Sequence, residues 1–214
     1  KAIDCTADAD SAVCLGYGAL ANASNTAAFG ASSSALLDSA SALGYSSNAA
    51  KTYSTAVGFE AFSNGSNAVS VGSSSKALGG SSTAVGSGAR ASAVNSVAIG
   101  SFAHASNTSS IAVGEGTTAR GITSLAIGYN SNAFNTSALA IGTSSSATNI
   151  NALAIGSGSQ ANYENSTAIG VDAQAMQAET SGIRSSVTIG ANKSQGGTDY
   201  FLPGFEDLPT SGTT

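Results

Sequence analysis

A glycine recurs every 14 residues over most of the chain, and this period constrains the fold more than any other feature. The first twelve repeat glycines have eleven consecutive intervals of 14, and the thirteenth follows after an interval of 20. They are Gly16, Gly30, Gly44, Gly58, Gly72, Gly86, Gly100, Gly114, Gly128, Gly142, Gly156, Gly170 and Gly190. Self-similarity at a fixed period is typical of solenoids, in which each unit contacts only its neighbours.

The residues around each repeat glycine predict two strands per unit. The residue before the glycine is apolar in every copy, the residue two positions earlier is often Val, Ile or Leu, and the residue between them is nearly always Ala. This alternation, stopped by glycine, is typical of a strand. Ala recurs again five residues after the glycine, with Ser63 as the exception. We expect a second, shorter strand there, whose inward position admits only a methyl group.

A flat coil fits these two strands. Fourteen extended residues span at most about 46 Å, and thirteen coils stacked at about 4.8 Å form a rod about 60 Å long. The repeat glycines supply a turn with positive φ. Polar residues at the second turn do the same: Asn25, Asn67, Ser81, Asn95, Asn151 and Asn165. The six extra residues before Gly190 predict a loop around Met176 to Ser185.

The alternation also predicts which side chains fill the coil. We expect the two aliphatic residues of each strand to lie inside and the alanine between them to point outward. Two aliphatic side chains per coil bury little apolar surface for fourteen ordered residues, and an outward face of methyl groups admits another chain. A homo-oligomer is therefore predicted, although such alanines are also tolerated in a monomeric solenoid. The predicted contact residues are Ala28, Ala42, Ala56, Ala84, Ala98, Ala112, Ala126, Ala140, Ala154 and Ala168.

Composition excludes several classes of protein. Only 9% of the residues are charged and there are two prolines, unlike a charged disordered tail or a proline-rich linker. The net charge is −5 and the seven Lys and Arg residues are scattered along the sequence, so nucleic acid is not an expected partner. No apolar run reaches the roughly 18 residues of a membrane-spanning helix.

Residues suited to catalysis are sparse. His104 is the single histidine, and we interpret it as an exposed or loop-packed residue because no Ser-His-Asp or zinc-ligand set can be assembled around it. Carboxylates such as Glu60 and Glu115 fall coils apart. The dinucleotide-like pattern from Gly16 to Ala21 is a by-product of the repeat, since other coils share it. We predict no enzyme activity, no cofactor and no metal.

The N-terminal segment carries both cysteines. Cys5 and Cys14 predict a local disulfide formed in an oxidising compartment, with two free buried thiols as the alternative. We divide the chain into a cap segment (1–12), the roll (13–190) and an exit or connector segment (191–214). The chain opens on Lys1 without an apolar signal region, so we expect a piece of a longer protein whose secretion signal and anchor lie outside it.

Aromatic residues are the best candidates for ligand contact. Tyr17, Tyr45 and Phe59 directly follow repeat glycines, and Phe62 lies nearby. Exposed aromatic residues on a repeating surface suit extended ligands. The alternative is that they cover the edge of the roll and pack on one another.

The motif Asn95-Ser96-Val97-Ala98-Ile99-Gly100, repeated over residues 13–190, resembles the YadA-like head of trimeric autotransporter adhesins. The resemblance implies a left-handed parallel β-roll and a homotrimer, with the flanking aliphatic residues in the core and the middle alanine at the trimer contact. It also implies a Gram-negative cell surface and an outer-membrane anchor in a C-terminal region absent here. The segment from Gly196 to Phe205 does not look like the family's usual neck.

Two functions follow from this resemblance. The first is an adhesive head, relevant to virulence, that binds host matrix proteins (collagen, fibronectin or laminin) or abiotic surfaces through repeated weak contacts. We expect its contact surface at the N-terminal tip, from Tyr17 to Phe62. The second is a passive spacer that presents another binding domain. Ice binding is a distant third, because no strict Thr-x-Thr ladder is present.

Overall fold

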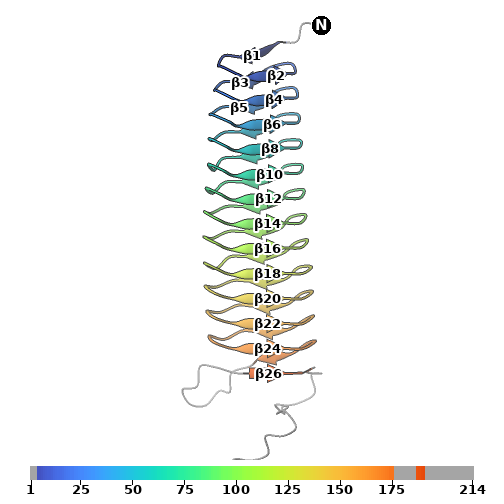
Figure 1. Cartoon of the computed structure of the whole chain (residues 1–214). Coiled ribbons are helices and arrows are strands. Elements are labelled where there is room, and N and C mark those ends of the chain that lie inside the picture. The colour runs from blue at the N-terminus through green and yellow to red at the C-terminus, as the bar shows by residue number, and fades with distance from the viewer. Residues whose placement is uncertain (1–3, 176–186, 191–214) are drawn as a thin grey trace, which may run out of the picture.

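A computed structural model describes residues 4–175 and 187–190 as a rod of short strands stacked coil upon coil (Figure 1). Every regular element in these residues is a β-strand. The strands form two parallel sheets, and each coil contributes one strand to each sheet. The predicted all-β solenoid with a 14-residue repeat is confirmed.

Sheet A contains the odd-numbered strands, most of which have two residues. They are β1 (Cys5–Ala7), β3 (Ala19–Ala21), β5 (Ser34–Ala35), β7 (Asn48–Ala49), β9 (Phe62–Ser63), β11 (Lys76–Ala77), β13 (Arg90–Ala91), β15 (His104–Ala105), β17 (Thr118–Ala119), β19 (Asn132–Ala133), β21 (Ser146–Ala147), β23 (Gln160–Ala161) and β25 (Gln174–Ala175).

Sheet B contains the even-numbered strands, each of three residues and each ending just before a repeat glycine. They are β2 (Val13–Leu15), β4 (Ala27–Phe29), β6 (Ser41–Leu43), β8 (Thr55–Val57), β10 (Val69–Val71), β12 (Thr83–Val85), β14 (Val97–Ile99), β16 (Ile111–Val113), β18 (Leu125–Ile127), β20 (Leu139–Ile141), β22 (Leu153–Ile155), β24 (Thr167–Ile169) and β26 (Val187–Ile189).

The register between coils is constant. Ala98 in β14 pairs with Ala112 in β16, an offset of 14, and β26 continues the ladder by pairing Ile189 with Ile169 at an offset of 20. The loop expected around residues 176–185 lies outside the described residues. At the other end, β1 pairs with β3 at the same offset of 14, so the parallel ladder begins inside the segment predicted to be a cap.

Both turns of the coil require positive φ. Gly100 has φ 130°, and a Cβ atom there would lie 2.5 Å from the carbonyl oxygen of Gly114 in the next coil. A side chain is therefore excluded by conformation and by space. At the second turn Asn95 has φ 56°. The sequence did not indicate a third such position, two residues after the glycine, where Glu60 and Phe102 have φ of 52° and 54°.

The predicted inside and outside of sheet B are reversed in the structure. Ala98 is completely buried within its own chain, whereas the neighbouring Ile99 is 40% exposed. The same holds from β4 to β24, where the middle residue of each strand of sheet B is buried in the roll. The alanines wrongly assigned to an outward trimer contact are Ala28, Ala42, Ala56, Ala84, Ala98, Ala112, Ala126, Ala140, Ala154 and Ala168.

The physical reason is the narrow space between the two sheets. Its lining consists of Ala, Ser and Thr, and the largest fully buried side chains are threonines. Several inward hydroxyl groups bond to a nearby carbonyl oxygen: Ser96 Oγ donates to that of Ala93 at 2.6 Å, and Ser47 Oγ donates to that of Gly44 at 3.0 Å. The hydroxyls of Ser82 and Ser131 are buried without such a partner. Val, Ile and Leu side chains need more room than opposing methyl groups leave, so they occupy the outer face of sheet B.

Candidate functional site

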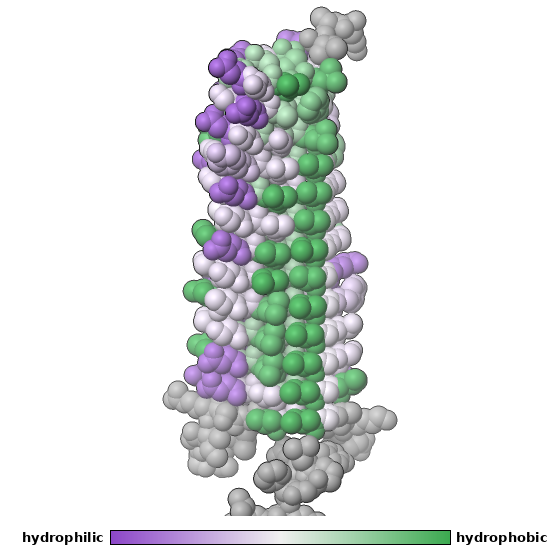
Figure 2. Space-filling model, viewed as in Figure 1, coloured by the Kyte–Doolittle hydropathy of each residue, from purple (hydrophilic) through white to green (hydrophobic). Residues whose placement is uncertain are grey.

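A double column of side chains runs along the outer face of sheet B (Figure 2). We call it the outer stripe. Its first column, directly before the repeat glycines, is Leu15, Phe29, Leu43, Val57, Val71, Val85, Ile99, Val113, Ile127, Ile141, Ile155, Ile169 and Ile189. Its second column, two residues earlier, is Val13, Ala27, Ser41, Thr55, Val69, Thr83, Val97, Ile111, Leu125, Leu139, Leu153, Thr167 and Val187.

The outer stripe is apolar and open to solvent in the single chain. The first column is apolar in every coil, and from Val69 onward most of the second column is apolar too. Leu15, Leu43, Ile99 and Ile127 are exposed, and the stripe follows the whole stack of sheet B. Soluble monomers rarely expose a continuous apolar patch larger than a few hundred Å². This surface therefore has the character of a contact between protein chains.

The predicted ligand aromatics lie on two different surfaces. Tyr17, Tyr45 and Phe59 are exposed in the turn that leads from sheet B to sheet A, and Tyr17 is 73% exposed. Phe62 lies instead in β9, half-buried on the outer face of sheet A. The rings of Tyr45 and Phe59 stack with centroids 5.5 Å apart. These two rings pack on each other, as the alternative interpretation has it, yet half or more of each side chain stays exposed.

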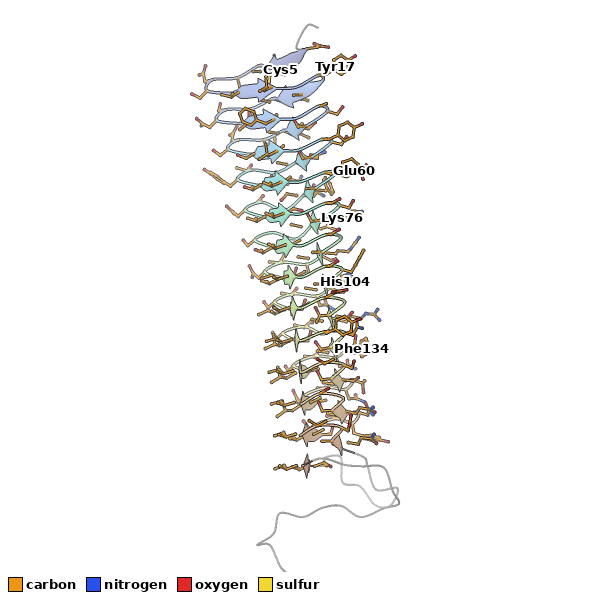
Figure 3. All side chains as sticks on the ribbon, turned by 90° about the vertical axis from the view of Figure 1, so that its right-hand side faces the viewer. Cys5, Tyr17, Glu60, Lys76, His104 and Phe134 are labelled. Atoms are coloured by element: carbon orange, nitrogen blue, oxygen red, sulfur yellow. A yellow bond between two sulfur atoms is a disulfide. The ribbon has the colours of Figure 1, made fainter. Side chains whose placement is uncertain are left out.

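A disulfide joins the two sheets at the N-terminal end. Cys5 in β1 and Cys14 in β2 are bonded, and Figure 3 shows Cys5 at the first coil, near Tyr17. The bond links sheet A to sheet B in the first described coil, and no other described coil packs against the N-terminal side of that coil. It therefore ties down the end of the solenoid that is most open to fraying.

His104 lies in β15 on the outer face of sheet A, with its Nε2 3.2 Å from Ser106 Oγ. Partial burial lowers its pKa below the ordinary value of 6.5, and the positive charges of Arg90 and Arg120 lower it further. Two cations thus act on the imidazole, and its one side-chain hydrogen bond among the described residues goes to a hydroxyl group and not to a carboxylate.

Two features are absent from the residues that the structure describes. No group of three or more His, Cys, Asp or Glu side chains there is arranged to hold a metal ion. In the same part of the chain, no helix has the length and hydropathy needed to cross a membrane.

The sequence pattern missed one arrangement that the register creates. Lys76, Arg90 and His104 are 14 residues apart, so they occupy adjacent rungs of sheet A. The basic residues are scattered in the sequence, but the fold places Lys76, Arg90 and His104 next to one another in register. Their spacing of one repeat was the signal that could have revealed this.

Comparison with known families agrees with the architecture. The family model YadA head domain repeat matches residues 38–61, 63–89, 91–117, 119–145 and 147–173. Most of these matches span 27 residues, or about two coils. A search of curated protein sequences gives no match. Because the matched segments follow one another over more than half of the sequence, the chain belongs to the YadA head repeat family and is a head domain of the trimeric autotransporter adhesin type.

Proposed function

We propose that this chain forms a homotrimeric adhesive head in which three rolls pack through their outer stripes. The observation that carries the proposal is the continuous apolar face of sheet B, which a single chain leaves exposed. Burying aliphatic surface contributes about 25 cal/mol per Å², and the stripe offers a contact in every coil. A rod with threefold symmetry gives each chain the same environment.

This packing directs sheet A and the turns toward the outside. Sheet A lies on the opposite side of the roll from the outer stripe, so its outward side chains stay accessible in such a trimer. Many copies of each surface position then recur along three chains, which favours binding by avidity. We propose host matrix proteins (collagen, fibronectin or laminin) or abiotic surfaces as targets. The cell surface is the proposed location, with an outer-membrane anchor in a further C-terminal region.

The N-terminal coils are the proposed contact surface. Tyr17, Tyr45 and Phe59 present exposed rings in one turn column, and Phe62 presents a fourth on sheet A. Flat, rigid aromatic rings provide large contact area at low entropic cost. The disulfide beside them holds the first coil in place.

A solid-phase binding screen tests this proposal. The purified head is applied to immobilised collagen, fibronectin, laminin and a polystyrene surface. We expect binding to at least one target, and a clear loss of that binding in the triple variant Tyr17→Ser, Tyr45→Ser, Phe59→Ser. Uniformly negative binding by a correctly assembled trimer would contradict the adhesive function.

A matched control uses three exposed aromatic residues from coils beyond this tip: Phe102→Ser, Tyr129→Ser and Tyr163→Ser. It removes as many aromatic rings from the surface without changing the proposed contact. If both triple variants lose binding equally, the contact is not located at the tip. Thermal melting of all three proteins checks that the roll is unchanged.

A passive spacer is the second candidate. The unbroken register from β1 to β25 makes a regular rod with nearly identical coils, which suits the separation of another domain from the cell. Uniformly negative binding in the screen supports this function instead.

A further inference from the structure

A ladder of positive side chains crosses the outer face of sheet A in four consecutive coils. We call Lys76, Arg90, His104 and Arg120 the cationic ladder. Lys76 pairs in register with Arg90, and Arg90 with His104; Arg120 directly follows β17, the next strand. At about 4.8 Å per coil the ladder spans about 14 Å. Figure 3 shows Lys76 and His104 projecting from the same side of the rod.

The ladder is not neutralised by its own sheet. Lys76, Arg90 and Arg120 are exposed, although the whole chain has a net charge of −5. From β3 to β25, the outward positions of sheet A carry no Asp or Glu. Like charges on directly paired residues destabilise a sheet. The pKa of His104 is lowered first by burial and then by the positive charges of Arg90 and Arg120.

The two arginines are held in defined positions by neutral groups. Arg90 Nε donates to Ser92 Oγ at 3.0 Å. The guanidinium carbon of Arg120 lies 5.3 Å from the centre of the Phe134 ring, a cation-π contact. These contacts orient each guanidinium without neutralising it, so both arginines can still form bidentate bonds with an anion.

The residues on the neighbouring strands of sheet A indicate which class of anionic ligand fits the ladder. Phe62 lies next to Lys76 in register, and below His104 the column continues with Thr118, Asn132 and Ser146. Amide and hydroxyl groups can exchange hydrogen bonds with sugar hydroxyls. An aromatic ring at the upper end can pack against the apolar face of a sugar. A straight column of this kind matches a stiff, extended glycan that carries strong acids.

Other extended anions fit this surface less well. Nucleic acids are held by larger sets of phosphate contacts, typically six to ten, than four residues supply. Acidic and phosphorylated peptides are recognised by clusters of arginine side chains, whereas this ladder has only two arginines, Arg90 and Arg120, on either side of the His104 rung.

From these observations we propose that the cationic ladder binds a sulfated glycosaminoglycan of the extracellular matrix. Sulfate groups face Lys76, Arg90 and Arg120, and the sugar chain runs along the rod. This inference rests on the proposed adhesive function and assigns a ligand chemistry and a site to it. Three ladders in a trimer would add avidity to a weak single contact.

Isothermal titration calorimetry with a heparin dodecasaccharide tests the proposal. The probe is compared with the desulfated dodecasaccharide and with single-stranded dT12 at the same salt concentration. We expect the head to bind the sulfated probe, with affinity falling as salt rises, and to bind the two comparison probes at least tenfold more weakly. Equal affinity for dT12 or for the desulfated glycan would overturn the assignment of the ligand.

A pair of variants matched in net charge locates the site. The ladder variant is Lys76→Gln, Arg90→Gln; the control is Lys51→Gln, Ser66→Glu, away from the outward column of sheet A, and both lower the net charge by two units from −5. All four side chains are exposed, so both proteins should melt like the parent. We expect about a tenfold or greater loss of affinity in the ladder variant and less than a twofold loss in the control. Equal losses would overturn the site.

The matrix screen separates this inference from the proposed function. A head that binds matrix proteins but not the sulfated probe contradicts the cationic ladder alone. A head that binds neither contradicts both proposals. Both proposals are supported if the parent head binds the sulfated probe and the ladder variant does not, while the head still binds immobilised collagen or laminin.

Discussion

Ala126 and Ile127 are consecutive residues of β18, yet Ala126 is completely buried inside the roll and Ile127 is 36% exposed on the outer stripe. One residue thus belongs to the core of the single chain, and the other belongs to the surface available for assembly. A one-residue step along a strand always changes the face of the sheet. Folding and oligomerisation can therefore be tested at neighbouring positions.

Enlarging the interior should destabilise the roll. Ala126→Leu places three additional carbon atoms between sheets that are lined by methyl and hydroxyl groups, and overpacking of this kind costs about 1–3 kcal/mol. We expect a lower melting temperature by circular dichroism. Thr118→Leu, an outward substitution on sheet A of the same coil, is the control and should melt close to the parent.

The repeat glycines should be intolerant of any side chain. In Gly100→Ala, the new Cβ would meet the carbonyl oxygen of Gly114 at 2.5 Å, and φ is 130°. We expect a loss of more than about 1 kcal/mol in unfolding free energy. Gly80→Ala is the matched control, because the nearest atom to a Cβ there is 4.0 Å away. Equal urea midpoints for the two variants would contradict the crowded stacking of the glycines.

Removal of the disulfide should act locally. The variant Cys5→Ser, Cys14→Ser frees β1 and β2, and closing a short loop is worth about 3 kcal/mol in the chain-entropy treatment. Because solenoid coils stabilise only their neighbours, hydrogen exchange should accelerate in residues 4–21 and remain unchanged beyond Gly100. Accelerated exchange along the whole rod would show that the first coil controls the stability of all the others.

Stability should depend on His104 in mildly acidic solution. Its pKa in the folded chain is lowered, first by burial and then by Arg90 and Arg120, so the unfolded chain binds the proton more readily. The contribution of His104 to the free energy of unfolding should stay constant above pH 6.5 and decrease as the pH falls below that value. It should level off once the pH is below the pKa of His104 in the folded chain. His104→Gln should remove this part of the pH dependence in urea titrations between pH 7 and pH 5. An unchanged profile would contradict both the partial burial of His104 and its cationic environment.

The repeat glycines explain why so much of the fold could be predicted from sequence. Their spacing of 14 predicts the stack, and the alternation at Val97-Ala98-Ile99 predicts the strand, since both are local properties of the chain. Alternation separates two faces but does not say which face is inside. Because large apolar residues usually lie in protein interiors, an inward position is predicted for Ile99. The inside of this roll is too narrow for that side chain.

A half-repeat in the sequence could have corrected that assignment. Ala91 and Ala98 are seven residues apart, and both are completely buried, one from each sheet. The same spacing recurs from coil to coil. The candidate surfaces were harder to predict, because the cationic ladder exists only once Lys76, Arg90 and His104 are brought into register. The Tyr45–Phe59 stack likewise depends on the contact between successive coils.

The molar mass of the head in solution tests the central claim most directly. We predict by light scattering a mass of three times 20.5 kDa for the parent chain. The variant Ile127→Glu, Ile141→Glu places charges on the outer stripe of adjacent coils, and it should fall to about 20.5 kDa while its β-sheet circular dichroism persists. The control Asn132→Glu, Ser146→Glu, outward on sheet A, should remain a trimer. A monomeric parent, or a stripe variant that stays trimeric, would contradict assembly through the outer stripe.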